Sequence, residues 1–228
     1  MTDAPRVVSR RERLRAQTLQ EIEDASFAII DAEGVHALSL AALAPSLAMS
    51  APALYRYFAS RDALVAHLVD LSYAQLTAAM AEAAGSSRRA PQTRVKLLVA
   101  AYREWALRHP RRYGMLFGEQ VGDMTVDPAA KTPLDQSMTL LIDLLVAAQG
   151  SSPADGSSGD RTLDSQLRLW ARARERPETT PRAGRAAIVI WTRVHGIVSL
   201  ELTGMFAGQS VEAQRLIDLE IDSAIRSL

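Results

Sequence analysis

The segment between Ser39 and Leu64 constrains the fold of this chain more than any other part of the sequence. Apolar residues recur in it at the i, i+3, i+4 and i+7 spacing that lines one face of a helix, namely Leu40, Leu43, Ala44 and Leu47. Ser39 precedes this run as an N-cap, and Ser50 caps a second helix with Pro52 in its first turn. The pattern predicts two short helices joined by a tight turn, with a third helix starting near Ser60.

The second short helix leaves an unusual set of side chains exposed. Leu54 and Phe58, four residues apart, are expected to face back onto the first helix. The residues that then point outward include two tyrosines and an arginine: Ala51, Ala53, Tyr55, Arg56 and Tyr57. A helix-turn-helix protein presents such a helix start to the major groove of DNA, so the segment predicts a DNA-binding unit.

These residues resemble the TetR family of transcriptional regulators. The likeness runs through Ile29-Ile30-Asp31-Ala32-Glu33-Gly34, Ser39-Leu40 with Leu43-Ala44, Leu54-Tyr55-Arg56-Tyr57-Phe58, and Ser60-Arg61-Asp62 with Leu64. It covers roughly the first third of the chain. The resemblance implies a homodimer that binds double-stranded operator DNA and whose C-terminal domain encloses a small-molecule effector.

Two positions depart from the family pattern. Family members usually have glycine at the turn where this chain has Ala48, so a positive φ there would carry strain. Pro45 falls inside the first short helix, where the lost backbone hydrogen bond can cost about 3 kcal/mol and kink or shorten the helix. Neither position touches the block from Leu54 to Phe58, and the resemblance stands.

The amino-acid composition excludes several classes of site and of function. The 228 residues include no cysteine, which excludes disulfides, thiol catalysis and cysteine-based zinc sites. Four scattered histidines predict no metal site, and no nucleophile–base pair is visible, so we expect neither catalysis nor a cofactor. The start lacks the apolar stretch of a signal peptide and no window is apolar enough to span a membrane, so we expect a cytoplasmic protein without a membrane partner.

The formal net charge is zero, but the positive charges are unevenly placed. Five arginines crowd the first fifteen residues: Arg6, Arg10, Arg11, Arg13 and Arg15. Taken alone, this segment is typical of a solvated tail. Directly upstream of a helix-turn-helix, it predicts a basic arm in which Arg10 and Arg11 reach phosphates or the minor groove.

Helical patterns continue to the end of the chain, and no segment alternates like a strand, so the fold class is all-α. We predict a three-helix DNA-binding domain over residues 1–60 and a larger helical domain for ligand binding and dimerisation over residues 61–228. Residues 150–160 are rich in glycine and serine and predict a flexible loop inside the second domain.

The last two helices predict the assembly. The stretch from Pro181 to Phe206 is apolar around most of its circumference, and Gly196 and Gly204 would admit a neighbouring helix. Ser210 is expected to cap a final helix whose stripe consists of Ile217, Ile221, Ala224 and Leu228. Two such helices from each of two chains would form a four-helix interface, whereas in the alternative the stripes only complete a monomeric core.

A second, weaker likeness lies in the segment WTRVHG, which resembles a signature of one C-terminal subtype within the family. It adds His195 to the residues that we expect to line a pocket for an amphipathic or aromatic effector. The other candidates are Tyr102, Trp105, His109, Phe117, Met138, Trp170 and Trp191. Each of them has an alternative as an ordinary core residue.

The expected DNA contacts have distinct roles. They come from Arg10, Arg11, Ser39, Ser50, Ala51, Pro52, Ala53, Tyr55, Arg56, Tyr57 and Arg61. Tyr55, Tyr57 and Arg61 would bind phosphates, and Arg56 a phosphate or a guanine edge. Side chains such as that of Pro52 can only pack on thymine methyl groups, so DNA shape is expected to carry more of the specificity.

The sequence therefore predicts a ligand-responsive transcriptional regulator that represses its genes. The alternative is an all-α small-molecule-binding protein or enzyme that has kept the fold without DNA binding. Pro45, Ala48 and the near-neutral N-terminal domain favour this alternative.

Overall fold

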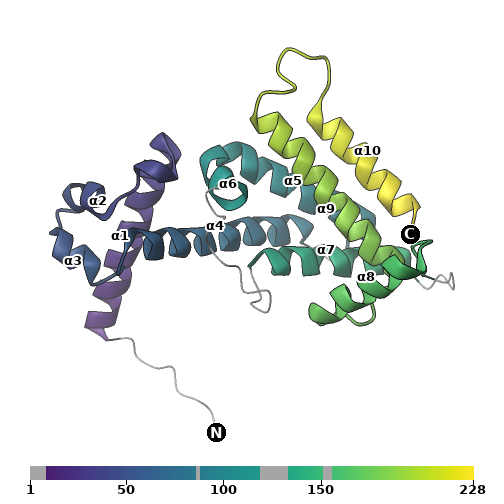
Figure 1. Cartoon of the computed structure of the whole chain (residues 1–228), viewed down its shortest axis with the longest axis horizontal. Coiled ribbons are helices and arrows are strands. Elements are labelled where there is room, and N and C mark those ends of the chain that lie inside the picture. Colours follow the sequence, from purple (N-terminus) through teal and green to yellow (C-terminus); the bar gives the residue numbers. More distant parts are fainter. Residues whose placement is uncertain (1–8, 86–87, 119–132, 151–155) are drawn as a thin grey trace, which may run out of the picture. The chain divides into compact units, whose positions relative to one another are not determined.

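The structure is a computed structural model that describes residues 9–85, 88–118, 133–150 and 156–228. Within these ranges the chain forms ten α-helices, one short 3-10 helix and no strand, which confirms the all-α prediction (Figure 1). The elements are α1 (Arg10–Glu33), η1 (Val35–Ala37), α2 (Leu40–Ser46), α3 (Ala51–Tyr55), α4 (Arg61–Ala84), α5 (Pro91–Arg108), α6 (Pro110–Phe117), α7 (Pro133–Gln149), α8 (Arg161–Ala173), α9 (Pro181–Leu202) and α10 (Ala213–Arg226). None of the helices in the described ranges has the length and apolar character needed to cross a bilayer.

The helices pack into two compact units. The first unit contains Met1–Ser72 and His109–Met124, and the second contains Tyr73–Arg108 and Thr125–Leu228. This division differs from the predicted boundary after residue 60, because the first half of α4 and the whole of α6 belong to the first unit. The chain therefore enters the second unit within α4, returns at α6, and enters it again.

Helix α1 begins at a capping box. The Ser9 hydroxyl accepts a hydrogen bond from the Glu12 amide at 3.2 Å, and the Glu12 carboxylate accepts one from the Ser9 amide at 2.7 Å. The cap places Arg10 and the arginines after it in the first turns of a helix. The expectation of an arm is thus wrong from Arg10 onward, while Arg6 lies outside the described residues.

The helix-turn-helix forms as predicted, with one local difference. The Ser39 hydroxyl accepts a hydrogen bond from the Ala42 amide at 3.0 Å and caps α2. Pro45 lies in the last turn, and α2 ends one residue later at Ser46. Ser50 occupies the N-cap position of α3, but its side chain makes no cap hydrogen bond.

Ala48 adopts the left-handed conformation that its position in the turn implied, with φ of 51°. Its amide donates to the Pro45 carbonyl at 3.2 Å, and the Met49 amide donates to the Ala44 carbonyl at 3.0 Å. These two hydrogen bonds form a Schellman motif, which satisfies carbonyls at the end of α2 and usually has glycine in the left-handed position. The turn keeps its geometry with alanine, at the expense of a strained backbone.

The second unit encloses its own apolar core. Helix α9 packs against α7, α8 and α10, and α5 packs against α7 and α10. Buried side chains at its centre are Val95, Leu98, Leu141, Leu145, Ile190, Val194, Val198, Ile217 and Ile221. Two expectations at the α9–α10 connection are wrong: α10 begins after Glu212 and not after Ser210, and Gly204 lies beyond the end of α9.

The predicted flexible loop is hydrogen-bonded in its second half. The Ser157 hydroxyl and the Ser158 amide each donate to the Asp164 carboxylate at 2.7 Å. These hydrogen bonds favour the ionised carboxylate and lower the pKa of Asp164 to about 2. Residues 151–155 of the predicted loop lie outside the described residues.

Replacing Ala48 with glycine should stabilise the first unit. Glycine adopts a positive φ without the Cβ clash, and the exposed alanine methyl group contributes little packing, so we expect Ala48→Gly to raise the free energy of unfolding by about 1 kcal/mol. Urea denaturation followed by circular dichroism measures the change. The matched control is Ala42→Gly, an exposed position inside α2, which should lower the free energy of unfolding by about 1 kcal/mol. Equal destabilisation by both variants would contradict the strain at Ala48.

Candidate nucleic-acid interface

Two buried side chains fix the orientation of α3. Leu54 has no exposed surface and Phe58 is 8% exposed. The side chain of Tyr55 is 55% exposed, and Pro52 and Arg56 are also exposed, while Ala51, Ala53 and Tyr57 are half-buried. Of the five residues predicted to point outward, Tyr55 and Arg56 are exposed, whereas Ala51, Ala53 and Tyr57 are half-buried; the DNA contacts of all five stay a prediction.

The N-terminal end of α1 carries a group of arginines without carboxylate partners. Arg10, Arg11, Arg13 and Arg15 are all exposed, and none forms an ion pair with another described residue. Cations at a helix N-terminus also oppose the helix dipole, which disfavours each by about 0.3–1 kcal/mol. These guanidinium groups are therefore open to an anion from outside the chain.

Several arginines elsewhere in the described residues form ion pairs with carboxylates. Arg112 binds Asp31 through two hydrogen bonds of 2.9 and 2.6 Å, Arg174 binds Asp135 at 2.8 Å, and Arg103 binds Glu201. Such pairs hold helices together and neutralise their charges locally. The arginines of α1 and Arg56 have no such partner in the described residues, and Arg161 and Arg172 on α8 share this property; the α1 group and Arg56 are distinguished by their place beside the helix-turn-helix.

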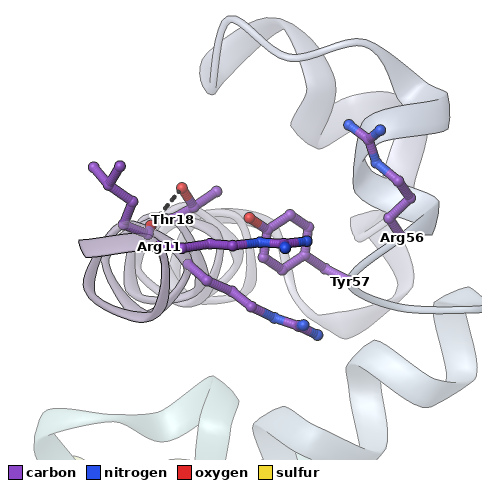
Figure 2. Close-up of a pocket in the computed structure, with 6 residues that line it drawn as sticks. Arg11, Thr18, Arg56 and Tyr57 are labelled. Atoms are coloured by element: carbon purple, nitrogen blue, oxygen red, sulfur yellow. Dashed lines mark hydrogen bonds between the residues drawn. The ribbon is translucent and has the colours of Figure 1, made fainter. Parts of the chain in front are cut away.

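An open groove with a volume of about 380 Å³ lies between α1 and the end of α3. It is lined by Arg11, Leu14, Arg15, Thr18, Arg56 and Tyr57. Figure 2 shows Arg11 and Tyr57 extending from opposite sides of the groove, and Arg56 leaving the end of α3. The guanidinium carbon of Arg15 lies 5.9 Å from the centre of the Tyr57 ring, within the range of a cation–π contact.

Three of these lining residues were not among the predicted DNA contacts. The sequence analysis interpreted the N-terminal segment as an arm and therefore did not predict a DNA contact for Leu14, Arg15 or Thr18. The spacing of Arg11, Arg15 and Thr18 at i, i+4 and i+7 was the signal that could have found them, because it places the three side chains on one face of a helix.

The Arg61 guanidinium group binds backbone carbonyls of the first unit, although its side chain remains 41% exposed. Its Nε donates to the Leu38 carbonyl at 2.9 Å and its Nη2 donates to the Val35 carbonyl at 2.8 Å. The guanidinium group thus joins the start of α4 to the η1 segment and to the residue before Ser39. Sequence reasoning gave Arg61 a phosphate contact and missed this structural role.

Two further contacts hold the helices of the first unit. His67 on α4 lies 2.7 Å from the Glu23 carboxylate on α1, and its ring is 5.2 Å from the ring of Phe58. Arg112 on α6 lies over the Phe27 ring at 4.0 Å while it binds Asp31. Both contacts connect α1 to segments far away in the sequence, and no local pattern could have predicted them.

Three of the predicted ligand residues meet in the second unit. The Tyr102 hydroxyl lies 3.0 Å from Nδ1 of His195, and the Tyr102 and Trp191 rings are 5.2 Å apart in an edge-on arrangement. The Trp191 and His195 rings are stacked with centres 6.4 Å apart. Burial lowers the pKa of His195 and so favours its neutral imidazole, which can donate or accept the hydrogen bond with Tyr102 according to its tautomer.

The remaining candidates occupy different places. Trp105 and Met138 are buried in the second unit, and Trp170 is half-buried with the Arg174 guanidinium 4.5 Å from its ring. His109 and Phe117 belong to the first unit, where His109 precedes α6 and Phe117 packs on Tyr113 with ring centres 4.8 Å apart.

Models of known protein families match segments of both units. A family model described as bacterial regulatory proteins, tetR family, matches residues 22–68. A second, described as the C-terminal domain of tetracyclin repressor-like proteins, matches residues 95–224, which is more than half of the chain. The chain belongs to the TetR family. The resemblance found in the helix-turn-helix is thereby confirmed, and the chain is a DNA-binding transcriptional regulator.

Individual relatives agree with this assignment. The HTH-type transcriptional regulator Rv1816 of Mycobacterium tuberculosis is 25% identical over 182 residues, which cover 76% of this chain and 75% of the relative. The crystal structure of the regulatory protein SCO4313 is 32% identical, covers 95% of this chain and 98% of its own, and has a TM-score of 0.74. A TetR protein from Acinetobacter baumannii AYE, solved in complex with minocycline, shares the fold at 16% identity and a TM-score of 0.54, with coverage of 96% and 95%.

Replacing Arg61 with alanine should destabilise the first unit. The variant leaves the Leu38 and Val35 carbonyls without their charged donor, and we expect the free energy of unfolding to fall by about 2 kcal/mol. Arg56→Ala is the matched control, because Arg56 is exposed and unpaired among the described residues and its loss should leave stability nearly unchanged. Thermal denaturation of both variants measures the difference. If Arg61→Ala unfolds like the wild type and only its DNA affinity falls, the structural role is wrong.

Proposed function

We propose that this TetR-family regulator is a homodimeric repressor that leaves its operator when a small molecule binds the second unit. The observation that carries the proposal is the cluster of Tyr102, Trp191 and His195. Tyr102 and His195 form a hydrogen-bonded pair beside the Trp191 ring. Helix α9, which carries Trp191 and His195, also packs against the other helices of the second unit.

On the DNA side, α3 would enter the major groove. Tyr55 and Tyr57 would donate their hydroxyl groups to phosphates, and Arg56 would reach a phosphate or a guanine edge. Pro52 would pack on thymine methyl groups together with Ala51 and Ala53. Ser39 already uses its hydroxyl group to cap α2, whereas that of Ser50 makes no cap hydrogen bond, which favours Ser50 over Ser39 as a phosphate contact.

The cluster favours an amphipathic or aromatic effector. Trp191 offers an apolar ring face, and the Tyr102–His195 pair places polar groups beside it, which together suit a ligand with a flat ring and a polar edge. The complex of the Acinetobacter TetR protein with minocycline, a polar polycyclic compound, supports this class of ligand. Trp105 and Met138 would shape the pocket from the core, and Trp170, His109 and Phe117 are secondary candidates.

The dimer interface would lie on the outer side of α9 and α10. Leu200 on α9 is 43% exposed and Leu219 on α10 is 63% exposed. A side chain added at Gly196 would meet no atom within 4 Å, so a second helix can approach α9 closely there. Ile221, in contrast, is completely buried inside the chain itself and belongs to the core.

Ligand binding can release DNA only if the effector binds the two conformations of the protein with different affinity. The coupling must then be reciprocal, so that operator DNA weakens effector binding by the same factor. The chain passes between the two units within α4, between α5 and α6, and again after α6, and we propose that helix α4, which belongs to both units, takes part in the coupling.

The sensor is testable by intrinsic fluorescence, because all three tryptophans lie in the second unit. We expect a compound from an aromatic library, with minocycline as the first probe, to change the tryptophan fluorescence and to weaken binding to a duplex selected from a random pool. His195→Leu removes the partner of Tyr102 and should abolish the response while operator affinity stays within about twofold of wild type. Leu169→Ala, at an exposed position of α8 that is not among the candidate ligand residues, is the control and should respond normally. A His195→Leu protein that still responds fully would contradict the assignment.

The dimer is testable with a matched pair of surface leucines. Leu219→Glu places a charge in the proposed interface, and the protein should sediment as a monomer at tens of micromolar with unchanged helix content. Leu169 on α8 is 65% exposed and lies away from α10 in the sequence, so Leu169→Glu should sediment like the wild type. A monomeric wild-type protein, or dissociation by both variants alike, would rule out this interface.

A further inference from the structure

The groove between α1 and the end of α3 concentrates positive charge without neutralising it. Three of its six lining residues are arginines, and no carboxylate lines it. None of the three guanidinium groups pairs with a carboxylate in the described residues, although ion pairs are common elsewhere in the chain. Like charges held around one open space repel each other, and an anion bound there would relieve that repulsion.

The lining also excludes an apolar ligand. Leu14 is the one aliphatic side chain among the lining residues, and it is 54% exposed. The Thr18 hydroxyl donates to the Leu14 carbonyl at 3.0 Å and fixes that side of the groove. What remains for a ligand is a set of guanidinium donors together with the Tyr57 phenol, and this donor set matches the oxygens of a phosphate group.

Part of the groove is organised before any ligand arrives. The capping box between Ser9 and Glu12 holds the first turn of α1, from which Arg11 projects. Arg15 lies against the Tyr57 ring, so its guanidinium group and the phenol are already adjacent. Less side-chain entropy is therefore lost when these groups bind an anion together.

We propose that this groove binds one phosphate of the DNA backbone, with Arg11 and Arg15 of α1 on one side and Arg56 and Tyr57 on the other. The inference rests on the proposed placement of α3 in the major groove. Arg56 and Tyr57 directly follow α3, so the phosphate in the groove belongs to the strand beside the base pairs that α3 contacts. Helix α1 thereby becomes a second DNA-contacting element, independent of base sequence.

The experiment uses a duplex selected from a random pool by the full-length wild-type protein, and a scrambled duplex of equal length. Arg15→Ala should weaken binding to both duplexes by about tenfold and reduce the slope of log affinity against log salt by about one. Single methylphosphonate substitutions, moved along the selected duplex, neutralise one phosphate at a time. At one position per half-site the substitution should weaken the wild type strongly and leave Arg15→Ala unaffected.

Arg13→Ala is the matched control, because it removes an exposed guanidinium group from the same part of α1 without touching the groove. It should keep the wild-type sensitivity to the methylphosphonate at that position. Arg15→Lys keeps the charge but loses the planar fork, and should bind with intermediate affinity. Circular dichroism confirms that the Arg15 variants fold, as expected for an exposed side chain.

Two results would overturn the proposal. In the first, no methylphosphonate position distinguishes Arg15→Ala from the wild type although both bind the duplex. In the second, Arg13→Ala and Arg15→Ala lose the same affinity and the same salt dependence, which would assign Arg15 to the general positive charge of α1 and not to a phosphate in the groove. A wild-type protein that selects no duplex at all would instead refute the proposed function.

Discussion

The burial of Leu54 and Phe58 is the constraint on which the DNA-binding unit depends. Helix α3 has five residues and is too short to be stable through its own hydrogen bonds, so its packing determines its conformation. Once Leu54 and Phe58 are inside, the helical rotation between them forces Tyr55 and Arg56 outward. The Arg61 hydrogen bonds then keep the following helix close to the segment before α2.

Local periodicity was enough to predict the helix-turn-helix, because its stability rests on residues a few positions apart. The positive φ at Ala48 was also predictable, since the turn needs a left-handed residue wherever α2 ends. Arg61 was misjudged because its acceptors are backbone carbonyls at Val35 and Leu38, and a sequence gives no sign of which carbonyls lack partners. Arg15 was missed because the start of α1 was placed too late in the chain.

The candidate ligand residues illustrate the same limit. Trp191 and His195 are one helical turn apart, so their stacking could be expected from the sequence. Tyr102 was a candidate by residue type, but its hydrogen bond to His195 spans 93 positions, and only the packing of α5 on α9 creates it. His109 and Phe117 were grouped with them because the chain was assumed to change domain once, whereas α6 returns to the first unit.

The unpaired arginines at the start of α1 also affect how this protein behaves in solution. With a formal net charge of zero and an isoelectric point near 6.9, the molecule as a whole is neither attracted to nor repelled by a polyanion at a distance. Beyond a Debye length of about 8 Å at physiological salt, little of the field of α1 remains. Encounters with DNA are thus not accelerated from afar, but a molecule already close to the duplex experiences a torque that turns its arginine-bearing end toward the phosphates. The same end should retain the protein on a heparin column at a pH where its total charge predicts no retention.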